Sequence, residues 1–380
     1  TSNGKYETNP SWSSNITWAS SQANTGKLAM LTTVIGSYPK PSFLKLPDWF
    51  NAKGGTDTKH PTEDYNNAIK SMGDEAESIF LKAAKEVIED QIACGIDIVT
   101  DGEVRRENYI HYHCRHLEGI DFNKLTKKIA RTGNYECWLP TIINKVEAKD
   151  SFLVHDWSVA QNISSQPVKI TMPGPMTITD TIANDYYTSN RELGEDLAKA
   201  INLELNRLVD AGCKYIQVDE PLFARKPKEA IAYGVENLEK CFDGISNTDV
   251  EKITHICCGY PDKLDAVDYP KAPLDSYHQI AELLDKSIVD SISIEDAHRY
   301  NDLSLLEKFK QSKIIFGLIK IASSEVETIS EIQKRIKDAL EHIDRERFIA
   351  APDCGLGHLP RKLAMKKLKT MVEALDEQGL

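Results

Sequence analysis

The chain has 380 residues, of which 41% are hydrophobic and 27% are charged, and its formal net charge is −12. This acidic balance disfavours the extended basic surface that nucleic-acid binding requires, and no apolar stretch approaches the roughly 20 residues of a membrane-spanning helix. The eight cysteines are irregularly spaced and follow no secretory leader, which favours reduced thiols in the cytoplasm over a disulfide framework. We therefore expect a cytoplasmic protein that acts on small molecules.

Residues 1–28 are rich in serine, asparagine and threonine, and we expect them to form a polar extension that is flexible unless it docks on the body. No proline- or glycine-rich linker divides the remainder. We therefore expect residues 29–380 to form a single domain.

From residue 31 onward, short β-branched runs alternate with longer amphipathic segments, a pattern typical of βα units around a parallel sheet. The predicted strands are 31–35, 97–100, 168–172, 215–218, 253–257, 291–294, 314–318 and 348–351. The main predicted helices are 75–94, 191–211, 276–284, 303–310, 325–341 and 361–375. Eight such units predict an α/β fold, a (β/α)8 or TIM barrel. The long connection 102–167 is predicted to be an insertion after the second strand, with a lid or hairpin around 138–146.

Four residues of metal-ligand type end three of the predicted strands: His255 with Cys257, then Glu295, then Cys354. His255 and Cys257 are two residues apart on a strand and therefore point to the same side. Any one of these residues could be buried for packing alone, but all of them fall at strand carboxyl ends, the rim that carries the active site of such barrels. Nitrogen, sulfur and carboxylate oxygen are the ligands that zinc prefers, so we predict a Zn²⁺ site, with Cys258 packed on the opposite face.

Other polar residues at strand ends suit an amino-acid ligand. We expect Asp219 to bind an amine, and Glu220 to form an ion pair with Arg105 or Arg106; a purely structural ion-pair network is the alternative for both carboxylates. Backbone N–H groups near Gly36 suit a ligand carboxylate.

The insertion also contains His111-Tyr112-His113-Cys114-Arg115-His116, with four side chains of ligand type in six residues. The spacing is not that of a zinc module, and no second cysteine pair follows closely. We therefore expect these histidines to lie in a solvated or substrate-binding loop.

Together these motifs resemble the catalytic, carboxyl-terminal domain of cobalamin-independent methionine synthases, in the barrel superfamily that includes uroporphyrinogen decarboxylase. The matching stretches are Thr32-Thr33-Val34-Ile35-Gly36-Ser37-Tyr38-Pro39, Gly102-Glu103, Gly174-Pro175-Met176-Thr177-Ile178, Ile216-Gln217-Val218-Asp219-Glu220-Pro221, His255-Ile256-Cys257, Ile292-Ser293-Ile294-Glu295 and Pro352-Asp353-Cys354-Gly355-Leu356. The resemblance implies a single-barrel methyltransferase of methionine biosynthesis, with a homocysteine-like thiol as acceptor. It makes His255, Cys257, Glu295 and Cys354 the zinc ligands, and Ile35, Gly36, Ser37, Glu103 and Asp219 the residues that bind the amino acid.

Three positions depart from the family. Ala322 stands where the family has a histidine proton donor, Thr181 where it has a tryptophan that stacks on the pterin, and Arg225 where it has a glutamate that contacts folate. The thiol half of the site therefore matches and the methyl-donor half does not, so the donor stays open among folate, corrinoid, sulfonium and epoxide. An epoxide-opening thiol alkyltransferase or lyase and a noncatalytic zinc-containing binding protein are the alternatives. The oligomeric state is also open, a homo-oligomer included.

Overall fold

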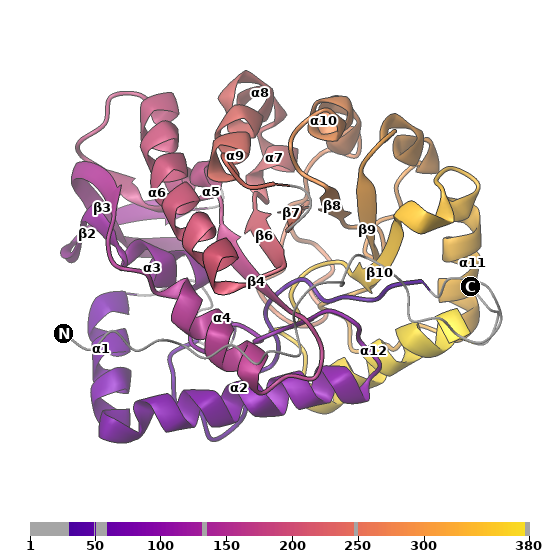
Figure 1. The fold of residues 1–380 in the computed structure, drawn as a ribbon, viewed down its shortest axis with the longest axis horizontal. Helices are drawn as coiled ribbons and strands as arrows, with labels where there is room; N and C mark the ends of the chain where they lie inside the picture. Colours follow the sequence, from indigo (N-terminus) through magenta and orange to yellow (C-terminus); the bar gives the residue numbers. More distant parts are fainter. Residues whose placement is uncertain (1–29, 49, 51–58, 131–134, 247–249, 377–380) are drawn as a thin grey trace.

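The main sheet consists of seven parallel strands that curl around a common centre (Figure 1). The computed structural model describes residues 30–48, 50, 59–130, 135–246 and 250–376, so the predicted extension 1–28 lies outside the described residues. In sheet order the strands are β1 (Val99–Thr100), β4 (Val168–Pro173), β6 (Tyr215–Asp219), β7 (Glu251–Ile256), β8 (Ser291–Ile294), β9 (Lys313–Ile319) and β10 (Phe348–Pro352). These confirm seven of the eight predicted strands.

The first predicted strand, 31–35, occupies its expected place but is not continuous. Thr32 bridges to Ala350 of β10, and Thr33 bridges to Ile98 beside β1, so this segment joins the two edges of the sheet and completes the barrel. Beyond Thr33 its carbonyl groups accept hydrogen bonds from side chains, for example from Lys169 to Val34, and the strand ladder ends.

A small apolar cluster, to which most strands contribute, lies inside the barrel. Its members are Ile35, Ile98, Tyr215, Ile253, Ile315, Ile349 and Ala351. A second, larger apolar cluster lies between the sheet and the surrounding helices. This division follows from the period-2 alternation of a strand, which sends successive side chains to opposite faces.

Helices cover the outside of the sheet (Figure 1). They are α1 (Pro61–Met72), α2 (Ala76–Ala93), α4 (Leu153–Asn162), α5 (Pro175–Thr181), α6 (Asn190–Ala211), α7 (Leu222–Arg225), α8 (Pro227–Glu229), α9 (Val235–Cys241), α10 (Ser276–Asp285), α11 (Ile329–Leu340) and α12 (Arg361–Asp376), with the short turns η2 (Gly73–Glu75), η3 (Ala230–Gly234), η4 (Leu303–Lys308) and η5 (Arg345–Arg347). Within the described part of the chain, none of them has both the length and the hydrophobicity that a bilayer crossing requires.

Local capping sets several helix bounds. Ser189, whose hydroxyl accepts the N–H of Glu192, caps the start of helix α6, and Gly212, which has a left-handed φ of 103°, caps its end. Helix α11 starts later than predicted because Thr328 and Glu331 form a capping box there. The predicted helix 303–310 is a 3₁₀ turn, η4.

The insertion after β1 is confirmed as a hairpin. Strands β2 (Leu117–Ala130) and β3 (Tyr135–Ala148) pair antiparallel, and β5 (Ala183–Asn184) adds to the edge of β3. Figure 1 shows this small sheet beside α3 (Tyr109–Cys114), at one end of the barrel.

The prediction of a solvated loop at His111–His116 was wrong. Residues 109–114 form α3, which begins at Asn108, whose side chain accepts the N–H groups of Ile110 and His111. The helix packs against β2 and β4, and His111 and His113 are each only 4% exposed. Local sequence gave no indication of this burial because the covering surfaces come from other segments.

Candidate functional site

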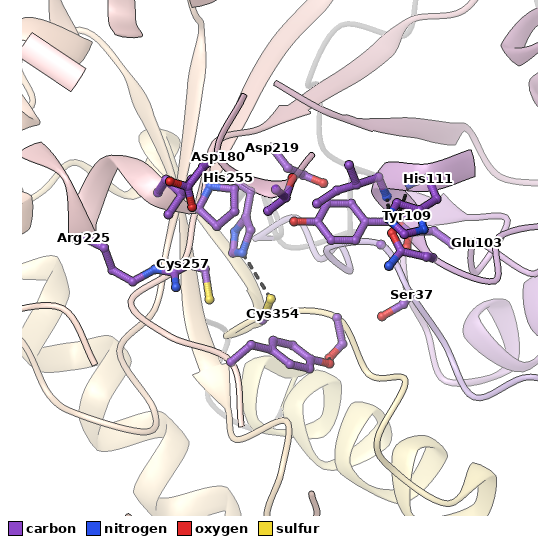
Figure 2. A pocket seen from close by; sticks show the side chains of 18 of the residues that line it. Ser37, Glu103, Tyr109, His111, Asp180, Asp219, Arg225, His255, Cys257 and Cys354 are labelled. Atoms are coloured by element: carbon purple, nitrogen blue, oxygen red, sulfur yellow. Dashed lines mark hydrogen bonds between the residues drawn. The ribbon is translucent and has the colours of Figure 1, made fainter. Parts of the chain in front are cut away.

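Two cysteines and a histidine meet at the carboxyl ends of β7 and β10. His255 Nε2 lies 3.3 Å from Cys354 Sγ, and the ligand atoms of His255, Cys257 and Cys354 all lie within 4.8 Å of one another (Figure 2). His255 and Cys257 are 3% and 4% exposed. Burial lowers the pKa of His255 to about 3, so its imidazole is neutral and its lone pair is free for a metal ion.

Glu295, immediately after β8, lies next to this cluster. Its Oε1 is 3.2 Å from Cys257 Sγ, and its Oε2 accepts the backbone N–H of Cys258 at 2.9 Å. Burial and the neighbouring Cys257 raise the pKa of the Glu295 carboxyl. The side chain of Cys258 belongs to the apolar cluster outside the barrel, as the strand alternation predicted.

The donor set fits zinc. One imidazole nitrogen, two sulfurs and a nearby carboxylate oxygen form the mixed set that zinc binds with four ligands, and the ends of three strands bring them together. The four predicted metal ligands are therefore close together in the structure. Glu295 contacts the other three through the sulfur of Cys257.

The cluster forms part of the wall of a cavity of about 500 Å³. Cys257, Cys354 and His255 line it, and so do all five residues predicted to bind an amino acid: Ile35, Gly36, Ser37, Glu103 and Asp219. In Figure 2 the cluster lies on one side of Asp219, and Glu103 and Ser37 lie on the other. The candidate metal ligands and the polar side chains thus line the same cavity.

The polar end of the cavity carries two carboxylates. Glu103 is held by Arg106, with Nη1 3.2 Å from Oε1, and by the Thr171 hydroxyl at 2.7 Å. A Cβ on Gly36 would lie only 2.5 Å from Glu103 Oε1, so only glycine allows this close approach. Burial, then repulsion from Glu103, raises the pKa of Asp219. A ligand ammonium group would relieve this repulsion.

Glu220 does not make the predicted ion pair. Its carboxylate accepts the backbone N–H groups of Thr177 at 3.0 Å and Met176 at 3.2 Å, at the amino end of α5. Arg106 instead pairs with Glu103, and Arg105 pairs with Glu77 on α2. The two adjacent carboxylates therefore point in different directions: Asp219 lies toward the cavity, and Glu220 lies toward helix α5.

The three positions that depart from the family pattern are divided between two places. Thr181 and Arg225 line the cavity, and Arg225 lies on the Cys257 side in Figure 2. Ala322 is only 2% exposed, and its carbonyl oxygen accepts the N–H of Asp265 at 2.7 Å. It is not among the residues that line the cavity.

Much of the cavity wall was not anticipated from the sequence. Tyr109 of α3 lines it, together with Lys128 and Leu139 of the hairpin. His111 of α3 also lines the cavity, as one of the two alternatives for the histidine-rich stretch expected, although it lies in a helix and not in a loop. Two lysines bind Asp180 of α5. Lys128 Nζ of β2 donates to its backbone oxygen at 2.8 Å, and Lys226, which follows α7, pairs with its carboxylate. The position of the insertion next to a strand end was the one signal that could have identified these residues.

Comparison with known proteins gives a consistent result. Residues 30–377 match a family model described as the catalytic domain of cobalamin-independent synthase. A methionine synthase of Saccharolobus solfataricus is 32% identical over 91% of this chain and 94% of its own length, and one of Sulfolobus acidocaldarius is 30% identical over 90% of each. The solved structure of a B12-independent methionine synthase from Shewanella sp. W3-18-1, in complex with selenomethionine, superposes with a TM-score of 0.79. It is 28% identical and covers 92% of this chain and 97% of that one.

Proposed function

The chain belongs to the family of cobalamin-independent synthase catalytic domains and is thus a methyltransferase of the methionine synthase type, and from this premise we propose that it methylates the sulfur of homocysteine at a zinc site. The proposed zinc ligands are His255, Cys257, Glu295 and Cys354. One observation carries the proposal: the histidine and the two cysteines converge within 4.8 Å in a cavity whose other end presents Glu103 and Asp219.

The proposed acceptor is an amino acid with a side-chain thiol. Glu103 and Asp219 would bind its ammonium group, and the backbone N–H groups of Ile35, Gly36 and Ser37 would bind its carboxylate. The Shewanella protein has selenomethionine in its structure, the selenium analogue of the product proposed here. The amino acid would then extend toward the cluster with its sulfur leading.

The residues of the cluster suit an activated thiol. Zinc, when bound, would lower the pKa of the substrate thiol from its usual value of about 8.5, so that the sulfur is a nucleophile at neutral pH. As zinc ligands, the thiolates of Cys257 and Cys354 and the carboxylate of Glu295 would supply more negative charge than the ion carries, so the substrate sulfur would stay electron-rich. The new bond joins this sulfur to the methyl carbon, and the leaving group of the donor keeps the electron pair of the bond that breaks.

We propose that the donor does not depend on a proton from position 322. Protonation of a leaving nitrogen by a general acid is typically worth about 10² to 10⁴ in rate, and Ala322 has no proton to give. Its burial away from the cavity lining supports this view. A corrinoid or sulfonium donor, whose leaving group needs no proton, is consistent with this arrangement.

A donor screen tests the proposal. Purified zinc-loaded protein would be incubated with L-homocysteine and, in separate reactions, methyltetrahydrofolate, methylcobalamin or S-methylmethionine, and methionine would be measured by mass spectrometry. We expect methionine from at least one proton-independent donor, with none from the Cys354→Ser variant. Turnover from methyltetrahydrofolate alone would overturn the proposed donor class and leave the zinc site standing.

A further inference from the structure

Four consecutive backbone carbonyl groups at the polar end of the cavity are all held by hydrogen bonds. They belong to residues 34–37, the segment that follows the last barrel bridge. The pairs are Val34 O with Lys169 Nζ at 2.6 Å, Ile35 O with Gln217 Nε2 at 2.8 Å, Gly36 O with Thr100 Oγ1 at 2.7 Å, and Ser37 O with the N–H of Leu356 at 2.8 Å. Three of the four donors are side chains from three different strands.

The N–H groups of this segment show the opposite behaviour. Within the part of the chain that the structure describes, the N–H groups of Ile35, Gly36 and Ser37 donate to no other group, although all three residues line the cavity. Buried backbone N–H groups are normally paired, and successive unpaired ones form a binding site for an anion. The fixed carbonyls therefore leave a row of donors for a ligand carboxylate.

The three side chains act from behind this segment. Thr100 and Lys169 are 1% exposed and Gln217 is 0% exposed, and none of them lines the cavity. They therefore do not touch a ligand in it. Their strands β1, β4 and β6 are neighbours in the sheet, so the three donors form one rigid surface under residues 34–36.

Gln217 and Lys169 also connect this segment to the two carboxylates. The same Gln217 Nε2 that donates to Ile35 also donates to Asp219 Oδ1 at 2.8 Å. Burial lowers the pKa of Lys169 to about 7, and the nearby carboxylates of Asp219 and Glu103 act in the opposite direction. The groups that would meet the carboxylate and the ammonium of an amino acid are thus fixed relative to each other.

We propose that Thr100, Lys169 and Gln217 are positioning residues for the amino-acid end of the substrate. They hold the carbonyls of residues 34–36 so that three N–H groups meet the carboxylate, while Gln217 holds Asp219 for the ammonium group. This inference rests on the proposed function, because it assumes that an α-amino acid occupies the cavity.

Calorimetric binding of L-methionine to the zinc-loaded protein tests this role. We expect Thr100→Val, Lys169→Met and Gln217→Met each to raise the Kd about tenfold or more, the effect expected from loss of roughly one hydrogen bond in the site. Thr100→Ser keeps the hydroxyl group and should bind nearly as tightly as the wild type. Zinc content should be unchanged in all four variants, and the KM for L-homocysteine should rise more than kcat falls.

A matched control separates positioning from general packing. Lys367 is equally buried, and its Nζ donates to the carbonyl of Lys320 and the carboxylate of Glu327, far along the chain from the segment. Lys367→Met should leave the Kd for L-methionine unchanged; an equal rise would refute the inference. If a buried lysine variant fails to fold, the comparison of Thr100→Val with Thr100→Ser decides.

The possible failures are distinguishable. Wild-type protein that binds neither L-methionine nor L-homocysteine would overturn the proposed function together with this inference. Wild-type binding that Thr100→Val and Gln217→Met leave unchanged would overturn the positioning role alone.

Discussion

The hydroxyl oxygen of Ser293 lies 2.8 Å from Nδ1 of His255, whereas the other ring nitrogen of His255 lies 3.3 Å from Cys354 Sγ. A hydrogen on Nδ1 would be donated to Ser293, which leaves the Nε2 lone pair directed at the sulfur. Metal-binding histidines usually have such a partner on the second nitrogen, because it fixes both the tautomer and the orientation of the ring. Ser293 is therefore expected to tune the proposed zinc site without touching the ion.

Removing this hydroxyl group should weaken metal binding. We expect Ser293→Ala to lower zinc affinity by about 10- to 100-fold, measured by competition with a chromogenic chelator, because the imidazole loses its orienting partner. Ser291, two residues earlier on β8, donates instead to Glu251 at 2.7 Å. Ser291→Ala should keep wild-type affinity, and similar losses in both variants would show that the strand, and not the His255 contact, matters.

Substitution of Cys354 and of Cys258 should have different effects on metal binding, because Cys354 belongs to the proposed zinc cluster and Cys258 lies in the apolar layer. Cys354→Ser should remove stoichiometric zinc, measured by mass spectrometry of the metal content, because a serine hydroxyl is a much poorer zinc ligand than a thiolate. Cys258→Ser should retain one zinc per chain, since that side chain packs in the apolar layer. Equal metal content in the two variants would contradict the assignment of faces.

The adjacent carboxylates of β6 predict a second contrast. Asp219→Asn should raise the Kd for L-homocysteine about 10- to 100-fold, because a hydrogen bond between charged groups is replaced by one to a neutral amide. Glu220→Gln should instead lower the melting temperature, since Glu220 caps α5, and leave the Kd nearly unchanged. A larger change in Kd for Glu220→Gln than for Asp219→Asn would exclude the proposed roles.

The burial of His111 predicts a loss of stability in mild acid. Burial, and then Arg115, lowers the pKa of His111 to about 3, far below its value of roughly 6.5 in an unfolded chain. Between these values the unfolded state takes up a proton that the folded state does not, so the free energy of unfolding falls as the pH falls. The contribution of this one residue is about 2 kcal/mol between pH 7 and pH 5.

Urea unfolding of wild type and His111→Phe at several pH values measures this contribution. The variant should lose about 2 kcal/mol less than the wild type between pH 7 and pH 5, whatever its absolute stability. The same change in the free energy of unfolding with pH in both proteins would mean that His111 is solvated in the folded protein.

Much of the fold follows from local sequence patterns. His255 lies near the carboxyl end of a short strand, and Glu295 and Cys354 each follow one closely. The carboxyl ends of the strands coincide in a parallel barrel, so the cluster could be predicted from three distant segments. The first predicted strand was harder, because side chains such as Lys169 end its ladder after Thr33. That interaction joins residues 135 positions apart and leaves no local pattern.

The parts of the site that could not be predicted are those built by tertiary packing. The histidine-rich stretch is polar in composition, yet His111 is buried because the hairpin and β4 cover α3. Likewise, Glu220 binds two backbone N–H groups at the amino end of α5, while Arg105 and Arg106 pair with Glu77 and Glu103. Composition gives the type of side chain, but the neighbouring elements decide its partner.

X-ray absorption at the zinc edge, with and without L-homocysteine, tests most directly whether this cluster binds a metal and presents it to the substrate. We expect one zinc per chain with two sulfur and two nitrogen or oxygen neighbours, and a third sulfur neighbour once L-homocysteine is added. Protein reconstituted under reducing conditions that retains no zinc, or a sulfur count that does not change with L-homocysteine, would contradict the proposed site.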